Sequence, residues 1–180
     1  MVGIGAAGDE SYPLRPFAPV WAAARDAGLH LVHHAGEDQG PESIRAAIAV
    51  GGTERLGHGI RVLEDDDLAT EVRERGIPIE VCPSSNVALG LVGSFAAHPL
   101  PELRAAGLIV TINTDIPAIV GTALAEEYRR VREAFGYDDR VVAGFARAAV
   151  SASFAPGPTK RRLHEQIDTW LGEHPPGVRS

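Results

Sequence analysis

Residues 29–59 read LHLVHHAGEDQGPESIRAAIAVGGTERLGHG and contain one complete strand–helix–strand pattern. The apolar run over residues 29–34 predicts a buried strand. A helical stretch begins at Pro41 and reaches Val50, with proline in its first turn and a Gly-Gly pair beyond its end. A second short strand is predicted at residues 55–57. Parallel strands joined by a helix are the repeating unit of α/β folds, so this segment decides the fold class.

The same alternation extends to both ends of the chain. Further strands are predicted at residues 2–5, 77–82 and 108–113. Further helices are predicted at residues 19–27, 63–75, 99–106, 123–135, 139–151 and 159–171. The sequence therefore predicts an α/β protein with about five parallel strands and surrounding helices. A closed (β/α)₈ barrel needs eight strands and about 250 residues, so composition leaves part of a barrel and a doubly wound sheet as alternatives.

Length and composition indicate an ordinary globular chain. The 180 residues are 44% hydrophobic and carry a formal net charge of −7, which disfavours a nucleic-acid partner or an anionic membrane. The lone Cys82 excludes an internal disulfide, and no apolar stretch reaches the roughly 20 residues of a membrane span. Without a signal-like beginning, a cytoplasmic location is expected. We expect one domain over residues 1–180, with a frayed tail at 172–180.

Polar residues follow every predicted strand. The strand ends run into Gly-Asp-Glu at residues 8–10, His-His-Ala-Gly-Glu at 33–37, Gly-His-Gly at 57–59, Cys-Pro-Ser-Ser-Asn at 82–86 and Asn-Thr-Asp at 113–115. Carboxyl ends of parallel strands are where catalytic groups gather, so these imidazoles and carboxylates could form a metal site with an adjacent acid. Singly, each has an ordinary structural explanation. Because side chains alternate along a strand, at most one of His33 and His34 should point into a common centre.

Taken together, these motifs resemble the adenosine deaminase family. The resemblance is carried by residues 3–10, 34–37, 54–59, 80–86 and 112–115, in the family's order and roughly its spacing, and it covers nearly the whole chain. The combination of His-Ala-Gly-Glu with Arg-Leu-Gly-His-Gly is specific. The resemblance implies a partial TIM-type (β/α) barrel, the C-terminal portion of a metal-dependent hydrolase barrel. It also implies zinc-dependent hydrolytic deamination of adenosine or a related adenine nucleoside or base.

Five residues receive roles from this resemblance. His34 and Asp115 would be zinc ligands, and Glu37 would share a proton with purine N1. His58 would orient the attacking hydroxide and stabilise developing charge. Gly8 would approach the purine through its backbone, since it has no Cβ.

Two features depart from the family pattern. The family's first strand supplies two more zinc ligands from a His-x-His pair, and no His-x-His occurs in these 180 residues. The chain therefore should bind zinc weakly by itself, unless a residue such as His33 is recruited. Ile116 stands where the family has a second aspartate that bonds purine N7, which implies lost activity or an altered ring on the substrate.

Three hypotheses follow. The chain is part of a zinc aminohydrolase that needs the missing N-terminal half, a catalytically inactive remnant that binds purines or assembles with other chains, or an enzyme that uses Glu37 and His58 as an acid–base pair without metal. A purine nucleoside or base is the expected substrate. An unclosed barrel exposes sheet edges, so we expect a homo-oligomer or a second chain that supplies the missing strands.

Overall fold

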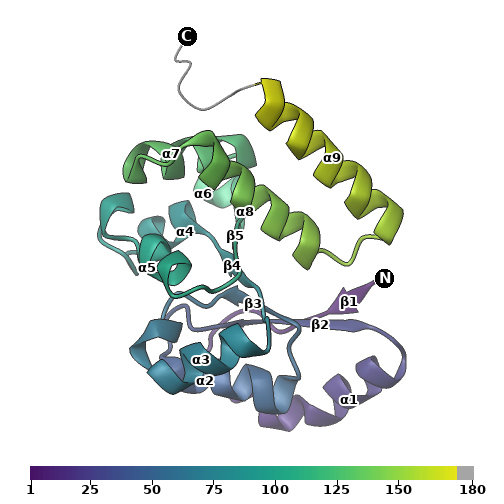
Figure 1. Cartoon of the computed structure of the whole chain (residues 1–180). Helices are drawn as coiled ribbons and strands as arrows, with labels where there is room; N and C mark the ends of the chain where they lie inside the picture. Colours follow the sequence, from purple (N-terminus) through teal and green to yellow (C-terminus); the bar gives the residue numbers. More distant parts are fainter. Residues whose placement is uncertain (174–180) are drawn as a thin grey trace. The chain divides into compact units, whose positions relative to one another are not determined.

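The computed structural model describes residues 1–173, which contain one five-stranded sheet (Figure 1). The strands are β1 (Gly3–Ile4), β2 (His30–Ala35), β3 (Arg55–His58), β4 (Ile79–Val81) and β5 (Val110–Ile112). They lie in chain order, and β1 to β4 pair in parallel. This arrangement confirms the predicted α/β fold with five parallel strands. Chain-order neighbours joined by helices are also what consecutive units of a (β/α) barrel present.

Helices connect the strands throughout. The α-helices are α1 (Ala18–Asp26), α2 (Pro41–Ala46), α3 (Asp66–Glu74), α4 (Pro83–Ala88), α5 (Leu100–Ala105), α6 (Pro117–Val120), α7 (Leu124–Phe135), α8 (Asp139–Ala152) and α9 (Gly157–Glu173). Shorter turns are η1 (Arg15–Phe17), η2 (Ala47–Gly51, a π-helix), η3 (Val62–Glu64) and η4 (Phe95–Ala97). Apart from α4 and α6, every α-helix matches a predicted helix within a few residues.

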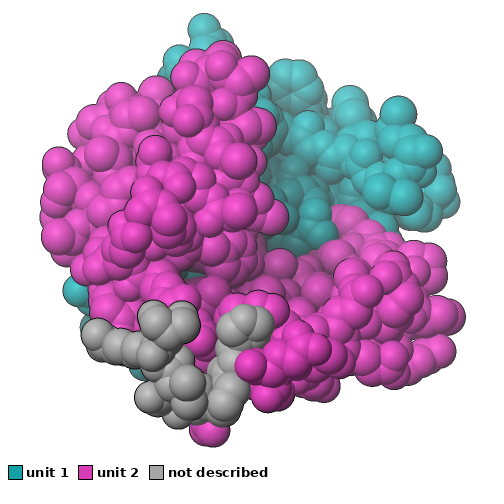
Figure 2. Space-filling view, turned by 90° about the horizontal axis from the view of Figure 1, so that it is seen from above, with its two compact units in different colours: residues 1–81, 99–110 teal, residues 82–98, 111–180 magenta. Residues whose placement is uncertain are grey.

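The chain divides into two compact units (Figure 2). Unit 1 comprises residues 1–81 and 99–110, and unit 2 comprises 82–98 and 111–180. The expected single domain over 1–180 stays a prediction. Of the expected tail, Gly172 and Glu173 belong to α9, and residues 174–180 lie outside the described part of the chain.

None of the helices in residues 1–173 combines the length and the apolar composition needed to cross a membrane.

In unit 1, β2 and β3 supply the centre of the core. Alternate residues of β2 are buried, and Leu31 is 1% exposed. Leu56 of β3 and Ile79 of β4 are fully buried, as is Ile44 of α2. These apolar side chains stabilise the sheet by removing hydrocarbon from water. The consequence for function is that the polar residues at the ends of β2 and β3 are held on a rigid framework.

In unit 2, a buried histidine contacts the middle of α4. His98 is 2% exposed, and its Nε2 lies 3.1 Å from Oδ1 of Asn86, which is itself fully buried in α4. Burial lowers the pKa of His98 to about 4, because the charged imidazolium would lose its hydration. The neutral ring therefore donates from Nε2 to the amide oxygen of Asn86.

This buried histidine predicts acid sensitivity. Between about pH 6.5 and pH 4 the unfolded chain binds a proton at His98 that the folded protein does not, so stability falls as the pH falls through that window. At about 1.4 kcal/mol per pKa unit, the loss is about 3 kcal/mol. Denaturant unfolding across this range should show a shallower pH dependence for His98→Gln, whose amide can still donate to Asn86. Equal pH slopes for both proteins would contradict the assignment.

Candidate active site

The two adjacent histidines of β2 serve different purposes. His33 is fully buried; its Nδ1 accepts the Ala6 amide at 3.0 Å, and its Nε2 lies 3.2 Å from the carbonyl oxygen of Gly51. Because Nδ1 accepts, Nε2 carries the proton and donates. Burial also lowers the pKa of His33, which keeps the ring neutral. With both nitrogens bonded to backbone, His33 holds β1 to the end of η2 and has no free nitrogen for a metal.

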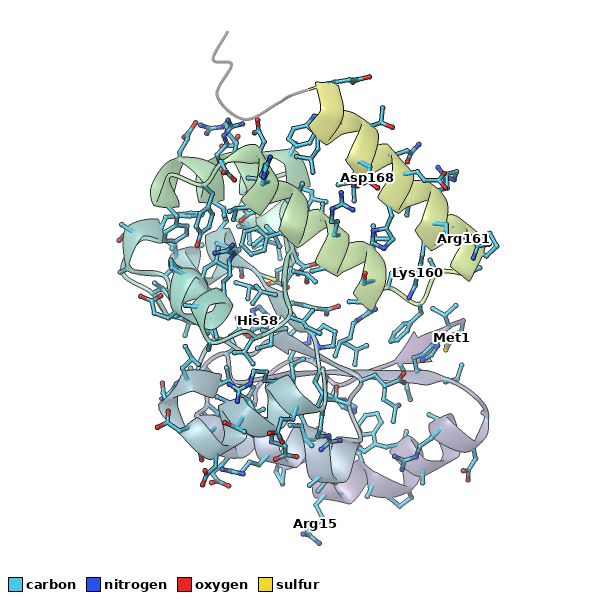
Figure 3. All side chains as sticks on the ribbon, viewed as in Figure 1. Met1, Arg15, His58, Lys160, Arg161 and Asp168 are labelled. Atoms are coloured by element: carbon cyan, nitrogen blue, oxygen red, sulfur yellow. The ribbon has the colours of Figure 1, made fainter. Side chains whose placement is uncertain are left out.

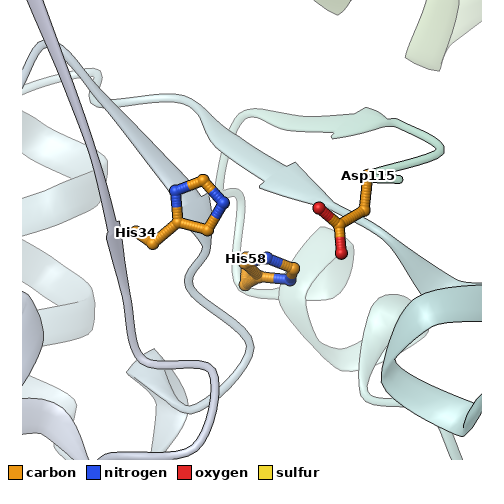
Figure 4. A group of neighbouring side chains, drawn as sticks. All are labelled: His34, His58 and Asp115. Atoms are coloured by element: carbon orange, nitrogen blue, oxygen red, sulfur yellow. The ribbon is translucent and has the colours of Figure 1, made fainter. Parts of the chain in front are cut away.

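His34 points to the opposite side of β2, as the alternation of strand side chains requires. The neighbouring strand has glycine at position 57, where a Cβ would lie 3.0 Å from His34 Nδ1. This glycine gives the His34 ring its room. The ring centroid of His34 lies 5.0 Å from that of His58, and the two residues offer nitrogens within 4.8 Å of each other. Figure 4 shows both rings beside the strands that carry them.

His58 and Glu37 form the second contact of the site. Nδ1 of His58 lies 3.4 Å from Oε1 of Glu37, with the two side chains 2% and 16% exposed. His58 ends β3 with a φ of 64°, in the left-handed region that non-glycine residues rarely adopt. Such backbone costs on the order of 1–3 kcal/mol and concentrates at functional sites. The structure thus brings three of the predicted residues, His34, Glu37 and His58, together in unit 1.

Glu10 organises the segment that carries Glu37. Its carboxylate accepts the amide of Glu37 at 3.1 Å, the amide of Gln39 at 3.0 Å and the hydroxyl of Ser43 at 3.3 Å. The Ser43 hydroxyl in turn accepts the amide of Gly36 at 2.8 Å. Burial raises the pKa of Glu10, although these hydrogen bonds oppose the shift. The sequence motif contained Glu10, but its bonds to backbone amides have no sequence pattern, so its role was missed.

A cavity of about 640 Å³ opens beside these residues in unit 1. Gly8 and Glu10 line it from the segment after β1, and His34 lines it from β2. Gly8 has a φ of 112°, and no atom lies within 4 Å of the place where its Cβ would be. Its backbone is therefore open to a ligand, and the predicted contact of Gly8 with a purine stays a prediction. The volume falls within the range of about 300–1,000 Å³ that small-molecule sites occupy.

Asp115 belongs to unit 2 and follows β5. The hydroxyl of Ser85, in α4, donates to its Oδ2 at 2.7 Å. Asp115 has a φ of 58°, and among residues 1–173 only it and His58 are non-glycine residues with positive φ. Both strained positions are residues that the sequence assigned to the site. That Asp115 is a metal ligand stays a prediction.

Comparison with known proteins establishes the family. The adenosine deaminase family model matches residues 1–170, and the chain therefore belongs to the adenosine deaminase family. This confirms the resemblance carried by the strand-end motifs.

Several similar proteins are named as deaminases. An aminodeoxyfutalosine deaminase of Streptomyces coelicolor is 42% identical over 171 residues, which is 94% of this chain and 44% of the relative. A crystal structure of adenine deaminase from Arthrobacter aurescens superposes with a TM-score of 0.92 at 33% identity, covering 96% of this chain and 53% of that one. A crystal structure of Arabidopsis ADAL complexed with IMP superposes with a TM-score of 0.85 at 28% identity, covering 96% of this chain and 50% of that one. The chain spans about half the length of the curated relatives it matches.

The Glu10 hydrogen bonds predict how the Glu37 segment responds to mutation. Glu10→Gln removes the charge and places an amide donor against the amides of Glu37 and Gln39. Hydrogen bonds to charged groups contribute about 1.5–3 kcal/mol, so hydrogen exchange at these two amides should accelerate by about tenfold or more. Glu54→Gln is a matched control, because Glu54 accepts the Leu31 amide away from this segment. Unchanged exchange at Glu37 in the Glu10 variant would show that the carboxylate does not hold the segment.

Proposed function

We propose that this chain supplies part of the active site of a zinc-dependent aminohydrolase. The reaction is hydrolytic deamination of adenosine or a related adenine nucleoside or base, in which water replaces the amino group at C6 and ammonia leaves. The observation that carries the proposal is the convergence of His34, Glu37 and His58 at the carboxyl ends of β2 and β3. Membership in the adenosine deaminase family supports it.

Three residues of the chain, Glu37, His58 and Gly8, have roles in this proposed reaction. Glu37 holds the proton that purine N1 receives, which makes C6 more electrophilic. His58 contacts Glu37 and orients the oxygen nucleophile toward C6. Gly8 presents its backbone to the purine from the cavity wall. Because Glu37 and His58 are largely shielded from solvent, proton transfer between them and the substrate is protected from exchange with bulk water.

The side chains suit zinc. His34 has an imidazole in a space kept open by the glycine at position 57, and Asp115 has a carboxylate held by Ser85; nitrogen and oxygen donors of these types are zinc ligands. We propose that His34 and Asp115 hold the ion. When bound, zinc lowers the pKa of water to about 7 and so provides hydroxide near neutral pH.

Catalytic zinc sites have three or more protein ligands, so the proposed site needs donors beyond these two. We propose that a polypeptide with the remaining strands, or another copy of this chain, joins the sheet at its outer strands, β1 and β5. We propose a cytoplasmic location for the assembled enzyme.

A second candidate is a purine-binding protein without catalysis. It is favoured by Ile116, which directly follows Asp115 and is 48% exposed, because its side chain cannot hydrogen-bond a purine nitrogen. The third hypothesis, an acid–base enzyme without metal, uses the same Glu37–His58 contact.

Reconstitution tests the proposal. The chain, mixed with the N-terminal half of a family member and zinc, should release ammonia from adenosine or adenine. Glu37→Gln should reduce the rate by about 100-fold or more, since general acid–base catalysis contributes about 10²–10⁴-fold. His30→Asn is a control, because His30 contacts Glu54 at an exposed position.

The alternatives give different results in the same assay. Activity that survives exhaustive chelation would favour the acid–base enzyme without metal. A folded, zinc-loaded complex that released no ammonia from any adenine derivative would contradict the proposed activity and leave purine binding alone.

A further inference from the structure

The residues that line the cavity of unit 1 include acidic side chains but no lysine or arginine. Eighteen residues line it, all in the described part of the chain, and they include three carboxylates but no lysine or arginine. The carboxylates are Asp9 and Glu10, from the segment after β1, and Glu42, from the first turn of α2. Gly8 and His34, which are part of the proposed deaminase site, line the same cavity. Any purine derivative in this cavity therefore meets these carboxylates.

Two of the three carboxylates are exposed and available to act on a ligand. Asp9 and Glu42 are exposed, whereas Glu10 is half-buried and engaged by backbone amides. The Ser11 hydroxyl and amide lower the pKa of Asp9, so this carboxylate is charged at neutral pH. A phosphate monoester carries close to two negative charges at pH 7. Like charges separated by less than a Debye length, about 8 Å at physiological salt, repel one another.

Two arginines of unit 1 partly offset this charge from outside the cavity lining, because Arg45 attracts Glu42 and Arg61 attracts Glu10. Arg45 is paired with Asp65, and Arg61 is paired with Glu64 and donates to the Asp38 carbonyl. Arg15 projects outward from its segment in Figure 3 and is not part of the cavity lining. None of these three arginines is among the residues that line the cavity.

The remaining lining is suited to uncharged groups. Tyr12, Leu14 and Phe17 contribute apolar and aromatic surface, and Tyr12 and Phe17 are 73% and 50% exposed. Such surface accommodates a sugar face or an apolar substituent without a counter-charge.

We infer that Asp9 and Glu42 are specificity-determining residues that reject phosphorylated purines, so that the substrate is an uncharged purine base or nucleoside. This inference rests on the proposed function for the position of the purine. It separates the chain from the Arabidopsis ADAL protein, whose structure was solved with the nucleotide IMP. The fold therefore accommodates a phosphate in that protein, whereas the charge of this cavity opposes one.

Binding by the ¹⁵N-labelled chain without zinc tests the inference. Adenosine, 5′-methylthioadenosine and 5′-AMP are titrated separately, and the amide shifts of Gly8, Tyr12 and Gln39 are followed by NMR. Adenosine and its uncharged 5′-thioether should bind alike, and AMP should bind at least about fivefold more weakly at low salt. The difference should diminish as salt is raised. The thioether separates charge from size, because it adds bulk without charge.

Charge-neutralising variants assign the effect to residues. Asp9→Asn keeps an oxygen that can accept the Ser11 amide, and Glu42→Gln is a surface change in α2. The double variant should narrow the adenosine-to-AMP preference by about three- to tenfold. Glu74→Gln, which changes the same charge on the exposed face of α3, should leave the preference unchanged.

Several outcomes would overturn the inference. These are AMP binding as tightly as adenosine, rejection of the thioether to the same extent as AMP, an equal effect of Glu74→Gln, or no shift of the cavity amides with any of the three compounds. Ammonia release by the reconstituted enzyme tests the proposed activity independently, so the two failures are distinguishable. If the reconstituted enzyme releases ammonia but the double variant keeps the same adenosine-to-AMP preference, only the specificity assignment of Asp9 and Glu42 is rejected.

Discussion

The alternation of side chains along β2 is the constraint on which the site depends. Consecutive strand residues point to opposite faces, so His33 and His34 cannot share a role. His33 turns into the core, where both of its nitrogens bond to backbone groups, and this fixes the strand relative to β1 and η2. His34 is thereby placed on the other face, beside His58. A shift of β2 by one residue would exchange the two histidines and remove the site.

Backbone strain and hydrogen bonding act together at the strand ends. His58 and Asp115 hold left-handed conformations that cost on the order of 1–3 kcal/mol each. The surrounding packing must offset that cost: Leu56 and Ile79 are fully buried beside His58, and Ser85 donates to Asp115. Likewise, the partly buried carboxylate of Glu10 accepts hydrogen bonds from backbone amides of the segment that carries Glu37. These features position the functional groups at a cost in the stability of the folded protein.

The sequence predicted the elements whose signals are local. Five strands and seven of the helices were recognisable from apolar periodicity and from glycine and proline at their ends. The α4 helix was missed because Ser-Ser-Asn, which follows its first residue Pro83, has low helix propensity, and only Cys82 separates the helix from β4. The π-helical turn η2 was also missed; its last residue, Gly51, lies against the His33 ring, a contact between segments distant in sequence. The division into two units has no compositional signal.

For the site, the strand-end motifs and their resemblance to the adenosine deaminase family selected His34, Glu37, His58, Gly8 and Asp115, whose roles stay predictions. Their geometry was not predictable, because the left-handed backbone and the bonds of Glu10 depend on contacts between segments distant in sequence.

The most direct measurement of the central claim is a zinc titration of the chain, followed through the ring nitrogens of its histidines by NMR. Zinc should shift the ring nitrogens of His34 while those of His33 stay unchanged. Equal shifts at both residues, or none at His34, would contradict the account.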